Sequence, residues 1–295
     1  MTTYFAYGSN LNHADWHAWC NANGYASDLL QPLGVARLLD YRLAFSRRSV
    51  RRGGGALNVL PTLGHVVEGM LFQVAGDEGW AALDKKEGAP RWYQRTPVFV
   101  QQENGEISET MTYIVHPEFC ESFVIPAAGY AELVRDGLLH WGLGSEALDT
   151  AAQNLPAAGL VNRLFCYGTL MQGECRFPIL KQLGFTTVSP ATTRGQLFNL
   201  GPYPALVTAT NDDGIVHGEL FSLTDPPIVL KRLDEVEGFD HHGSPVNLYS
   251  RRLLKIESVS ARLQWAWGYC SEKDLGGFPI ESGCWRTEPP NPDFH

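Results

Sequence analysis

The chain has 295 residues, of which 44% are hydrophobic and 19% charged, and its formal net charge is −9. At about 150 residues per domain, this length predicts two domains, each able to bury its own core. The acidic balance argues against nucleic acid as a partner, because phosphate contacts need an excess of Lys and Arg. No apolar stretch approaches the ~20 residues that cross a bilayer, so we expect no membrane association.

The cysteines and the start of the chain indicate the compartment. The six cysteines are scattered and form no C-x-x-C pair, which favours reduced thiols over a disulfide framework. The chain runs directly into an apolar segment and a turn motif, which leaves no room for a secretory signal peptide. We therefore expect a soluble, cytoplasmic protein.

The first predicted strand, Tyr4 to Ala6, ends in a glycine-containing turn that precedes a helix-like segment at 12–20. Glycine lets the backbone come close to a ligand, and amides at the start of a helix attract anions. This turn therefore predicts a site for a substrate carboxylate, with an ordinary strand-to-loop turn as the alternative. It consists of Tyr7, Gly8, Ser9 and Asn10.

A basic segment follows at 47–55, with four arginines and three glycines. It lacks the G-x-x-x-x-G-K-[ST] pattern of a phosphate-binding loop. We expect a solvated loop between strands, whose charge attracts anionic substrates toward the first half.

Short β-rich segments recur in both halves, and a helix is expected near 130–138. Many strands with few helices predict α+β domains, each a curled sheet or a small barrel. The strands are expected at 66–72, 96–100 and 109–115, and at 216–221, 252–256 and 263–269.

Leu-Asp-x-x-Glu-Gly, at 83–88, is the motif that most strongly suggests chemistry. Trp80, Leu83 and Glu87 fall on one face of a predicted helix, and Lys85 and Lys86 are expected to point elsewhere. A carboxylate at a helix C-terminus meets the negative end of the dipole, which is unfavourable by ~0.3–1 kcal/mol. Burial acts in the same direction, so we expect a raised pKa suited to acid/base catalysis. The alternative is a structural hydrogen bond near a helix cap.

These motifs recur in the same order in the second half. The turn reappears as Tyr167, Gly168, Thr169 and Leu170. The acid reappears as Glu237, on a helix expected to begin near Pro226 and to end at Gly238. A Tyr-x-Arg pair follows each acid, at Tyr93/Arg95 and at Tyr249/Arg251. Repeated motifs in one order predict two copies of one domain with one kind of site.

A small, uncharged segment at 150–159 predicts the linker, so the expected domains are 1–152 and 160–295. A proline-rich stretch at 289–292 predicts an extended tail. His13 and His17 have the i, i+4 spacing of a helical metal pair but lack an evident third ligand, so no metal site is expected.

The ordered motifs resemble the γ-glutamylcyclotransferase superfamily, which includes AIG2-like and γ-glutamylamine cyclotransferase branches. The first half is more similar to the cyclotransferase branch and the second to the AIG2-like branch. The first-half matches are F-A-Y-G-S-N-L at 5–11, V-x-G-x-L-F at 67–72 and L-D-K-K-E-G-x-x-x-x-Y-Q-R at 83–95. The second-half matches include Y-G-T-L-M at 167–171, V-H-G-E-L-F at 216–221 and L-D-E-V-E-G at 233–238.

The resemblance implies two tandem domains, each a small mixed β-barrel with flanking helices. It implies a cyclisation in which a γ-glutamyl α-amine attacks its own γ-carbonyl and releases 5-oxoproline, with no cofactor. Glu87 and Glu237 would be the catalytic acid/base residues. The two turns would bind the small γ-glutamyl substrate, together with Tyr93, Tyr113, Tyr249 and Tyr269.

The two copies are unequal. Six positions separate Glu87 from Tyr93, but twelve separate Glu237 from Tyr249, because of an insertion at 239–247 that either gates or disturbs the second pocket. Thr169-Leu170 in place of Ser9-Asn10 suggests that the two pockets prefer different substrates. Two alternatives stay open: one active and one structural half, or a non-catalytic module that binds small ligands. The halves are also candidates to pack as a pseudo-dimer.

Overall fold

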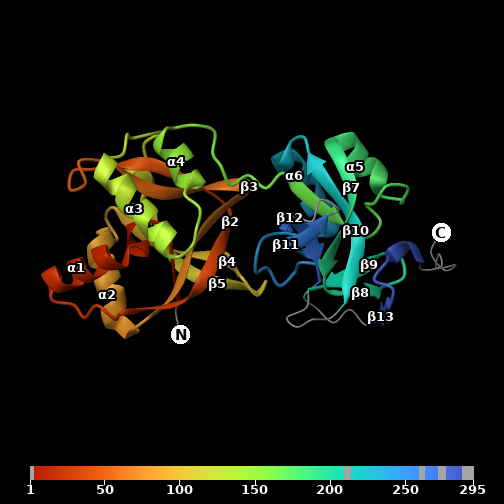
Figure 1. Cartoon of the computed structure of the whole chain (residues 1–295), viewed down its shortest axis with the longest axis horizontal. Coiled ribbons are helices and arrows are strands. Elements are labelled where there is room, and N and C mark those ends of the chain that lie inside the picture. Colours follow the sequence, from red (N-terminus) through yellow and green to blue (C-terminus); the bar gives the residue numbers. More distant parts are fainter. Residues whose placement is uncertain (1–2, 209–213, 259–262, 272–276, 288–295) are drawn as a thin grey trace. The chain divides into compact units, whose positions relative to one another are not determined.

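The computed structural model describes residues 3–208, 214–258, 263–271 and 277–287. The chain divides into two compact units, residues 1–160 and 161–295 (Figure 1). The expected tail at 289–292 lies outside the described residues. Helix α4 (Glu146–Ala152) takes in the start of the segment expected to be a linker, because Leu148 and Ala151 are buried in the first core.

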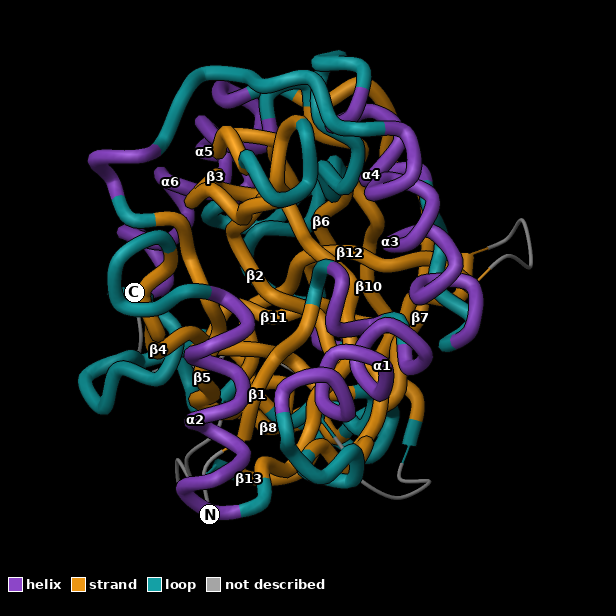
Figure 2. The backbone as a smooth tube through the Cα atoms, turned by 90° about the vertical axis from the view of Figure 1, so that its left-hand side faces the viewer, coloured by secondary structure: helices purple, strands orange, loops and turns teal. Residues whose placement is uncertain are grey.

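The first unit is a closed five-stranded barrel in the order β1-β3-β2-β4-β5. Strand β1 closes it, because β1 pairs antiparallel with β3 and parallel with β5. Helices α1 and α2 lie outside the strands (Figure 2). The strands are β1 (Thr3–Ala6), β2 (Leu30–Ser49), β3 (Gly54–Val74), β4 (Tyr93–Gln102) and β5 (Ile107–Val115). The helices are η1 (Ser9–Leu11), α1 (His13–Asn23), α2 (Gly76–Glu87), η2 (Pro117–Phe119), α3 (Ala128–His140) and α4.

The second unit repeats this topology in the order β10-β6-β12-β11-β7, again as a closed barrel. Strand β6 pairs antiparallel with β10 and parallel with β12, as β1 does with β3 and β5. The barrel strands are β6 (Arg163–Cys166), β7 (Phe185–Arg194), β10 (Ile215–Leu223), β11 (Ser250–Ser258) and β12 (Leu263–Cys270). A small sheet holds β8 (Gln196–Asn199), β9 (Pro204–Val207) and β13 (Phe278–Pro279), and the helices are α5 (Phe177–Leu183), α6 (Pro226–Glu237) and η3 (Trp285–Thr287). The prediction of two tandem α+β barrels with flanking helices is confirmed.

The expected loop at 47–55 is wrong at both ends, because β2 runs to Ser49 and β3 begins at Gly54. Arg47 and Arg48 belong to β2 and pair with Ala56 and Gly55 of β3, so only a short turn separates the two strands. The β2–β3 pairing shifts register between Phe45 and Arg47, which is a β-bulge. Bulges re-aim side chains and are common next to binding sites.

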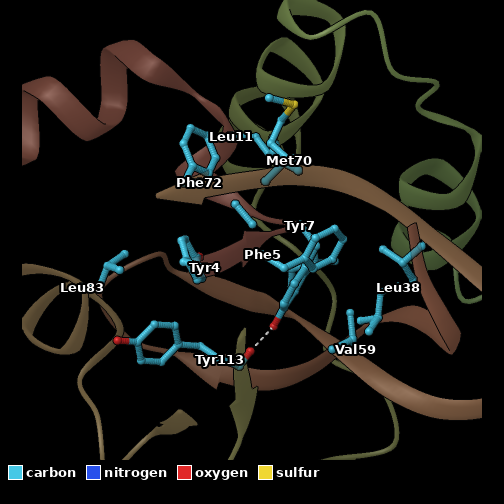
Figure 3. Packing of buried hydrophobic residues seen from close by; sticks show 14 of the residues in the cluster. Tyr4, Phe5, Tyr7, Leu11, Leu38, Val59, Met70, Phe72, Leu83 and Tyr113 are labelled. Carbon is cyan, nitrogen blue, oxygen red and sulfur yellow. Dashed lines mark hydrogen bonds between the residues drawn. The ribbon is translucent and has the colours of Figure 1, made fainter. Parts of the chain in front are cut away.

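The core of the first unit gathers around β1, where Phe5 is fully buried and Tyr4 and Tyr7 flank it (Figure 3). Gly69 of β3 crosses β1 so closely that a Cβ there would lie 2.2 Å from the Ala6 carbonyl oxygen. Gly218 of β10 has the same role, at 2.3 Å from the Cys166 carbonyl oxygen. The repeated V-x-G pattern therefore has a packing reason within each barrel.

Candidate functional site

Glu87 is the last residue of α2, as the helical spacing predicts. Leu83 and Trp80 anchor the helix in the core, and Gly88 ends it in the left-handed conformation at φ 68°. Asp77 and Glu78 in the first turn complement the helix dipole, whereas Glu87 faces its unfavourable end. The helix thus holds the carboxylate at a fixed point beside the turn after β1.

Asn10 connects that turn to the acid. Its Nδ2 donates to Glu87 Oε1 at 2.8 Å and to Tyr4 Oη at 2.9 Å. The Oδ1 of Asn10 is buried and has no hydrogen-bond partner among the described residues. Burial raises the pKa of Glu87, and the neighbouring Lys86, the Asn10 hydrogen bond, Arg52 and Arg47 act against that rise. The carboxylate is thus partly buried and electrostatically supported.

A pocket of about 250 Å³ opens beside Glu87. Three of the predicted site residues line it, namely Ser9, Glu87 and Tyr93. Its other walls come from the end of the β2–β3 hairpin, from the last turn of α2 and the residues that follow this helix, and from α3. These walls are Arg47, Ser49, Arg51, Arg52, Ala56, Lys85, Lys86, Gly88, Trp92 and Tyr130.

The other predicted residues of the first half lie behind this lining. Tyr7 Oη donates to the Tyr113 carbonyl oxygen at 2.5 Å, which ties the turn to β5 (Figure 3). Tyr93 Oη donates to the Leu57 carbonyl oxygen at 2.8 Å, so Tyr93 presents its ring rather than its hydroxyl. Gly8 has space around it, because a Cβ there would meet only atoms 3.9 Å away. Protein packing therefore does not require glycine at this position.

Each half also contains a Tyr–Asp–Arg cluster behind its acid. Tyr113 Oη donates to Asp84 Oδ1 at 2.6 Å, and Arg95 pairs with the same carboxylate. In the second half, Tyr269 Oη donates to Asp234 Oδ1 at 2.7 Å, and Arg251 Nε donates to it at 2.8 Å. The repeated Asp and Arg of the sequence motifs thus join the helix that bears the acid to two barrel strands.

Glu237 ends α6 as Glu87 ends α2, with Leu233 buried below it and Gly238 left-handed at φ 65°. The side chain of Asp225 caps the helix start by accepting from Ile228 N. Burial raises the pKa of Glu237 to about 7, and Arg176, whose Nη1 lies 4.0 Å from Oε1, acts against that rise. The acid is therefore repeated in position, but its neighbours differ.

The second pocket is much smaller, at about 40 Å³. Pro204 covers the turn, since a Cβ on Gly168 would lie 2.5 Å from its Cγ, so protein packing requires this glycine. Tyr167 Oη donates to the Tyr269 carbonyl oxygen at 2.6 Å, and Tyr249 Oη to the Pro204 carbonyl oxygen at 3.0 Å. All seven predicted residues of this half line the pocket, namely Tyr167, Gly168, Thr169, Leu170, Glu237, Tyr249 and Tyr269.

The insertion at 239–247 forms a compact loop. Asn247 accepts from Asp240 N and donates to the His241 carbonyl oxygen, each at 2.8 Å. Leu248 N donates to the Gly238 carbonyl oxygen at 3.0 Å, which closes the loop on the helix end. Tyr249 thus reaches the pocket beside Glu237 despite the longer spacing.

One expectation about the lysines is wrong. Lys85 and Lys86 both line the first pocket instead of pointing away from it. Lys86 is held by Asp15, with Nζ and Oδ2 2.7 Å apart, and it lies over the rings of Trp16 and Trp19. The helical periodicity placed Lys86 off the apolar face, but α1 packs against that side and buries it.

Several lining residues were not predicted as site residues. In the first half these include Tyr130, Trp92 and the pocket-lining arginines, and the arginines had been singled out only for their charge. In the second half Arg176, Tyr203 and Pro204 line the pocket. Most of these residues lie far from the acids in the sequence, so no local spacing connects them with the site.

The two histidines at the i, i+4 spacing lie close together with their rings tilted. The rings of His13 and His17 lie 3.8 Å apart, and His140 lies 6.4 Å from His13. Among the residues that the structure describes, no three His, Cys, Asp or Glu side chains are arranged to hold a metal ion. All six cysteines are free. Within the same described ranges, no helix combines the length and the apolar character needed to cross a bilayer.

Comparison with solved structures gives matches at low sequence identity. A gamma-glutamyl cyclotransferase is 24% identical over 53% of this chain and 88% of its own, with a TM-score of 0.44. An AIG2-like protein from Mus musculus is 18% identical over 38% of this chain and 78% of its own, with a TM-score of 0.32. YkqA from Bacillus subtilis is 15% identical but covers 92% of this chain and 84% of its own, with a TM-score of 0.34.

No curated protein sequence matches this chain significantly. The family described as gamma-glutamyl cyclotransferase, AIG2-like, matches residues 4–131 and 164–287, which is most of both barrels and includes both acids. The chain therefore belongs to the gamma-glutamyl cyclotransferase, AIG2-like family and carries that domain twice.

Proposed function

We propose that this protein releases 5-oxoproline from γ-glutamyl amino acids or amines. The observation that carries the proposal is the repeated placement of a buried glutamate at a helix end, beside a Tyr-Gly-Ser/Thr turn in a pocket. Two copies of one arrangement with raised glutamate pKa values favour an acid/base role over a structural one. Membership of the family supports the same reaction class.

The reaction is an intramolecular acyl transfer. The substrate enters with its α-amine protonated, and the ionised Glu87 or Glu237 takes one proton from it. The freed amine then attacks the γ-carbonyl carbon, so that the ring N–C bond forms and the C–N bond to the leaving group breaks. The protonated glutamate gives this proton to the departing nitrogen, and the regenerated carboxylate then takes the second proton from the ring nitrogen and passes it to the released amine, which leaves as an ammonium. Nucleophile and electrophile belong to one molecule, so positioning and one proton shuttle supply most of the catalysis.

The turn after the first barrel strand would bind the substrate α-carboxylate through backbone amides, namely those of residues 7–10 or 167–170. Space around Gly8 leaves room for a ligand to approach the backbone of the first turn. Asn10 holds Glu87 through a hydrogen bond from behind the pocket lining and would orient its carboxylate toward the substrate ammonium. The second half has Leu170 there, so its substrate would rely on Glu237 alone.

The test is 5-oxoproline release from a panel of γ-glutamyl amino acids and amines by the wild type, Glu87→Gln, Glu237→Gln and the double variant. Removal of an acid/base group should lower kcat at its site by about 10²–10⁴-fold. We expect activity in each single variant and none in the double variant. Glu235→Gln is the matched control, because Glu235 lies on the same helix with 58% of its side chain exposed.

The outcomes separate the alternatives. Full activity in one single variant and none in the other would mean that one half alone is catalytic. Because the second pocket is small, we would then expect Glu87 to be the catalytic residue. Binding of γ-glutamyl ligands without any 5-oxoproline would reject the enzyme in favour of a binding module.

A further inference from the structure

We infer that the first pocket selects γ-glutamyl compounds whose leaving group carries two carboxylates, as an acidic amino acid does. This inference rests on the proposed function and names the substrate class of its first site. Its basis is a concentration of positive charge in the pocket, together with the way the protein holds two of the guanidinium groups.

The lining of the first pocket is strongly basic within an acidic chain. The whole chain has 32 acidic and 23 basic residues. Within the lining, Glu87 is the only acidic residue, against five basic residues. These are Arg47, Arg51, Arg52, Lys85 and Lys86. A concave site with one sign of charge concentrates ligands of the opposite sign.

Carboxylates of the protein neutralise this charge only in part. Asp15 Oδ2 lies 2.7 Å from Lys86 Nζ and 3.8 Å from Arg52 Nη2, so one carboxylate serves two cations. Arg47 Nε is buried and has no hydrogen-bond partner among the described residues. A buried donor without an acceptor is costly unless a ligand satisfies it.

Aromatic rings hold the two guanidinium groups in place. Arg47 lies over Trp92 and Tyr93, with centroid distances of 4.9 and 5.2 Å. Arg52 lies over Tyr130 at 4.8 Å. A guanidinium over an aromatic ring retains several N–H donors, so beside its contacts with Tyr93 or Asp15 it can still pair with a ligand carboxylate. The β-bulge before Arg47 aims this side chain at the pocket.

The distribution of charge in the substrate determines which part of it contacts Arg47 and Arg52. The γ-glutamyl group carries one ammonium and one carboxylate, so it adds no net charge. The excess positive charge of the pocket is therefore available to bind the leaving group. Two carboxylates on the leaving group would match the two guanidinium groups of Arg47 and Arg52.

The second pocket provides the internal comparison. Arg176 is the only cation in its described lining, and it lies 4.0 Å from Glu237. The second pocket, at about 40 Å³, also leaves less room for a leaving group than the first pocket, at about 250 Å³. The selection is therefore expected in the first half alone.

The experiment compares two nearly isosteric substrates, γ-glutamyl-glutamate and γ-glutamyl-glutamine, in the full chain carrying Glu237→Gln. We expect kcat/KM to be about tenfold higher for γ-glutamyl-glutamate, as one charge-assisted contact gives. Arg47→Met and Arg52→Met should each reduce this ratio to about 3 or less, and 0.5 M NaCl should reduce it as well. Arg48→Met is the control, because Arg48 lies outside the pocket lining, is mostly exposed and pairs with Glu121.

Equal kcat/KM for the two substrates, with 5-oxoproline released from both, would overturn this inference and leave the proposed function intact. Release from neither would reject catalysis of this reaction by the first site, and calorimetric Kd values for the same two compounds would then test the charge selection of its pocket. A tenfold tighter Kd for γ-glutamyl-glutamate that Arg47→Met abolishes would support the pocket, and equal Kd values would overturn it. If Arg47→Met does not fold, Arg52→Met and the salt dependence give the same decision.

Discussion

In the first barrel, Asn10 donates a hydrogen bond to Glu87, and a wide basic pocket opens beside it. In the second barrel, Leu170 occupies the matching position, Arg176 approaches Glu237 at 4.0 Å, and the pocket is narrow. The acid is in the same place in both, at the end of a helix that a left-handed glycine terminates. The comparison teaches that duplication preserved the element that fixes the acid, while the groups around each acid diverged.

The largest expected difference concerns the Tyr–Asp–Arg clusters. The Arg251 side chain is 2% exposed, whereas those of Arg95 and Asp84 are about a third exposed. Removing one partner of a buried pair typically costs 3–5 kcal/mol, while an exposed pair contributes about 0–1 kcal/mol. Asp234→Asn should therefore destabilise its unit by about 3 kcal/mol, and Asp84→Asn by about 1 kcal/mol or less.

Hydrogen–deuterium exchange of peptides from each unit measures this effect locally. Asn retains an oxygen that accepts from the tyrosine, so the comparison isolates the charge. Equal losses of protection in the two variants would show that burial of the pair does not distinguish the two halves.

A second prediction concerns stability and pH. The pKa of Glu237 is raised from an ordinary 4.5 to about 7, so the folded state holds its proton more tightly than the unfolded state. The resulting stability is fully present below pH 4.5 and is lost as the pH rises through 7. Glu237→Gln should therefore stabilise the protein by up to about 3 kcal/mol at pH 8 and by little at pH 4.

Thermal unfolding across this pH range measures the difference. Glu235→Gln serves as the control, because Glu235 lies on the same helix and its side chain is mostly exposed. A Glu237→Gln effect that does not change with pH would contradict the prediction.

A third prediction concerns activity and pH. The ionised glutamate accepts the substrate proton, so the second site, isolated in Glu87→Gln, should lose activity below pH 7 and retain about a tenth at pH 6. The hydrogen bond from Asn10 and the nearby cations restrain the rise in the pKa of Glu87. We therefore expect the first site, isolated in Glu237→Gln, to keep its activity to lower pH. Coincident kcat/KM profiles would refute this difference.

The smallest expected effect comes from exchanging the residues beside the acids. Asn10→Leu removes a hydrogen bond to the carboxylate and should lower kcat/KM of the first site about fivefold, as the loss of about 1 kcal/mol implies. It should also raise the pKa of Glu87 and move the acidic limb of its profile to higher pH. Leu170→Asn should move the limb of the second site to lower pH. A fall in kcat/KM without any shift of the limb would indicate damage to packing only.

Sequence reasoning succeeded where the signal is local. The spacing of Trp80, Leu83 and Glu87 placed the acid on its helix, and the following glycine ended that helix. The pairing of a turn with this acid recurs in both halves, and the structure brings the two together through Asn10 and Glu87. The roles assigned to these residues stay predictions until activity is measured.

The same reasoning did not reach contacts between distant elements. Substrate binding by Tyr113 and Tyr269 stays a prediction; both donate to the motif aspartates, and Tyr269 but not Tyr113 lines one of the two described pockets. Lys86 was expected to point away, and α1 buries it. The Asp and Arg of each motif were used only to recognise the repeat. In the structure, each pair connects the helix that bears the acid to the barrel strands.

The sequence by itself determined that one domain occurs twice, and at which helix position each acid lies, because helical periodicity and glycine caps act over a few residues. Only the tertiary structure decided what surrounds each acid. Barrel closure, the bulge before Arg47 and the packing of α3 bring Arg47, Arg52 and Tyr130 to Glu87, whereas Pro204 narrows the space beside Glu237. Those contacts depend on strand register and on packing between distant segments, which no local pattern encodes.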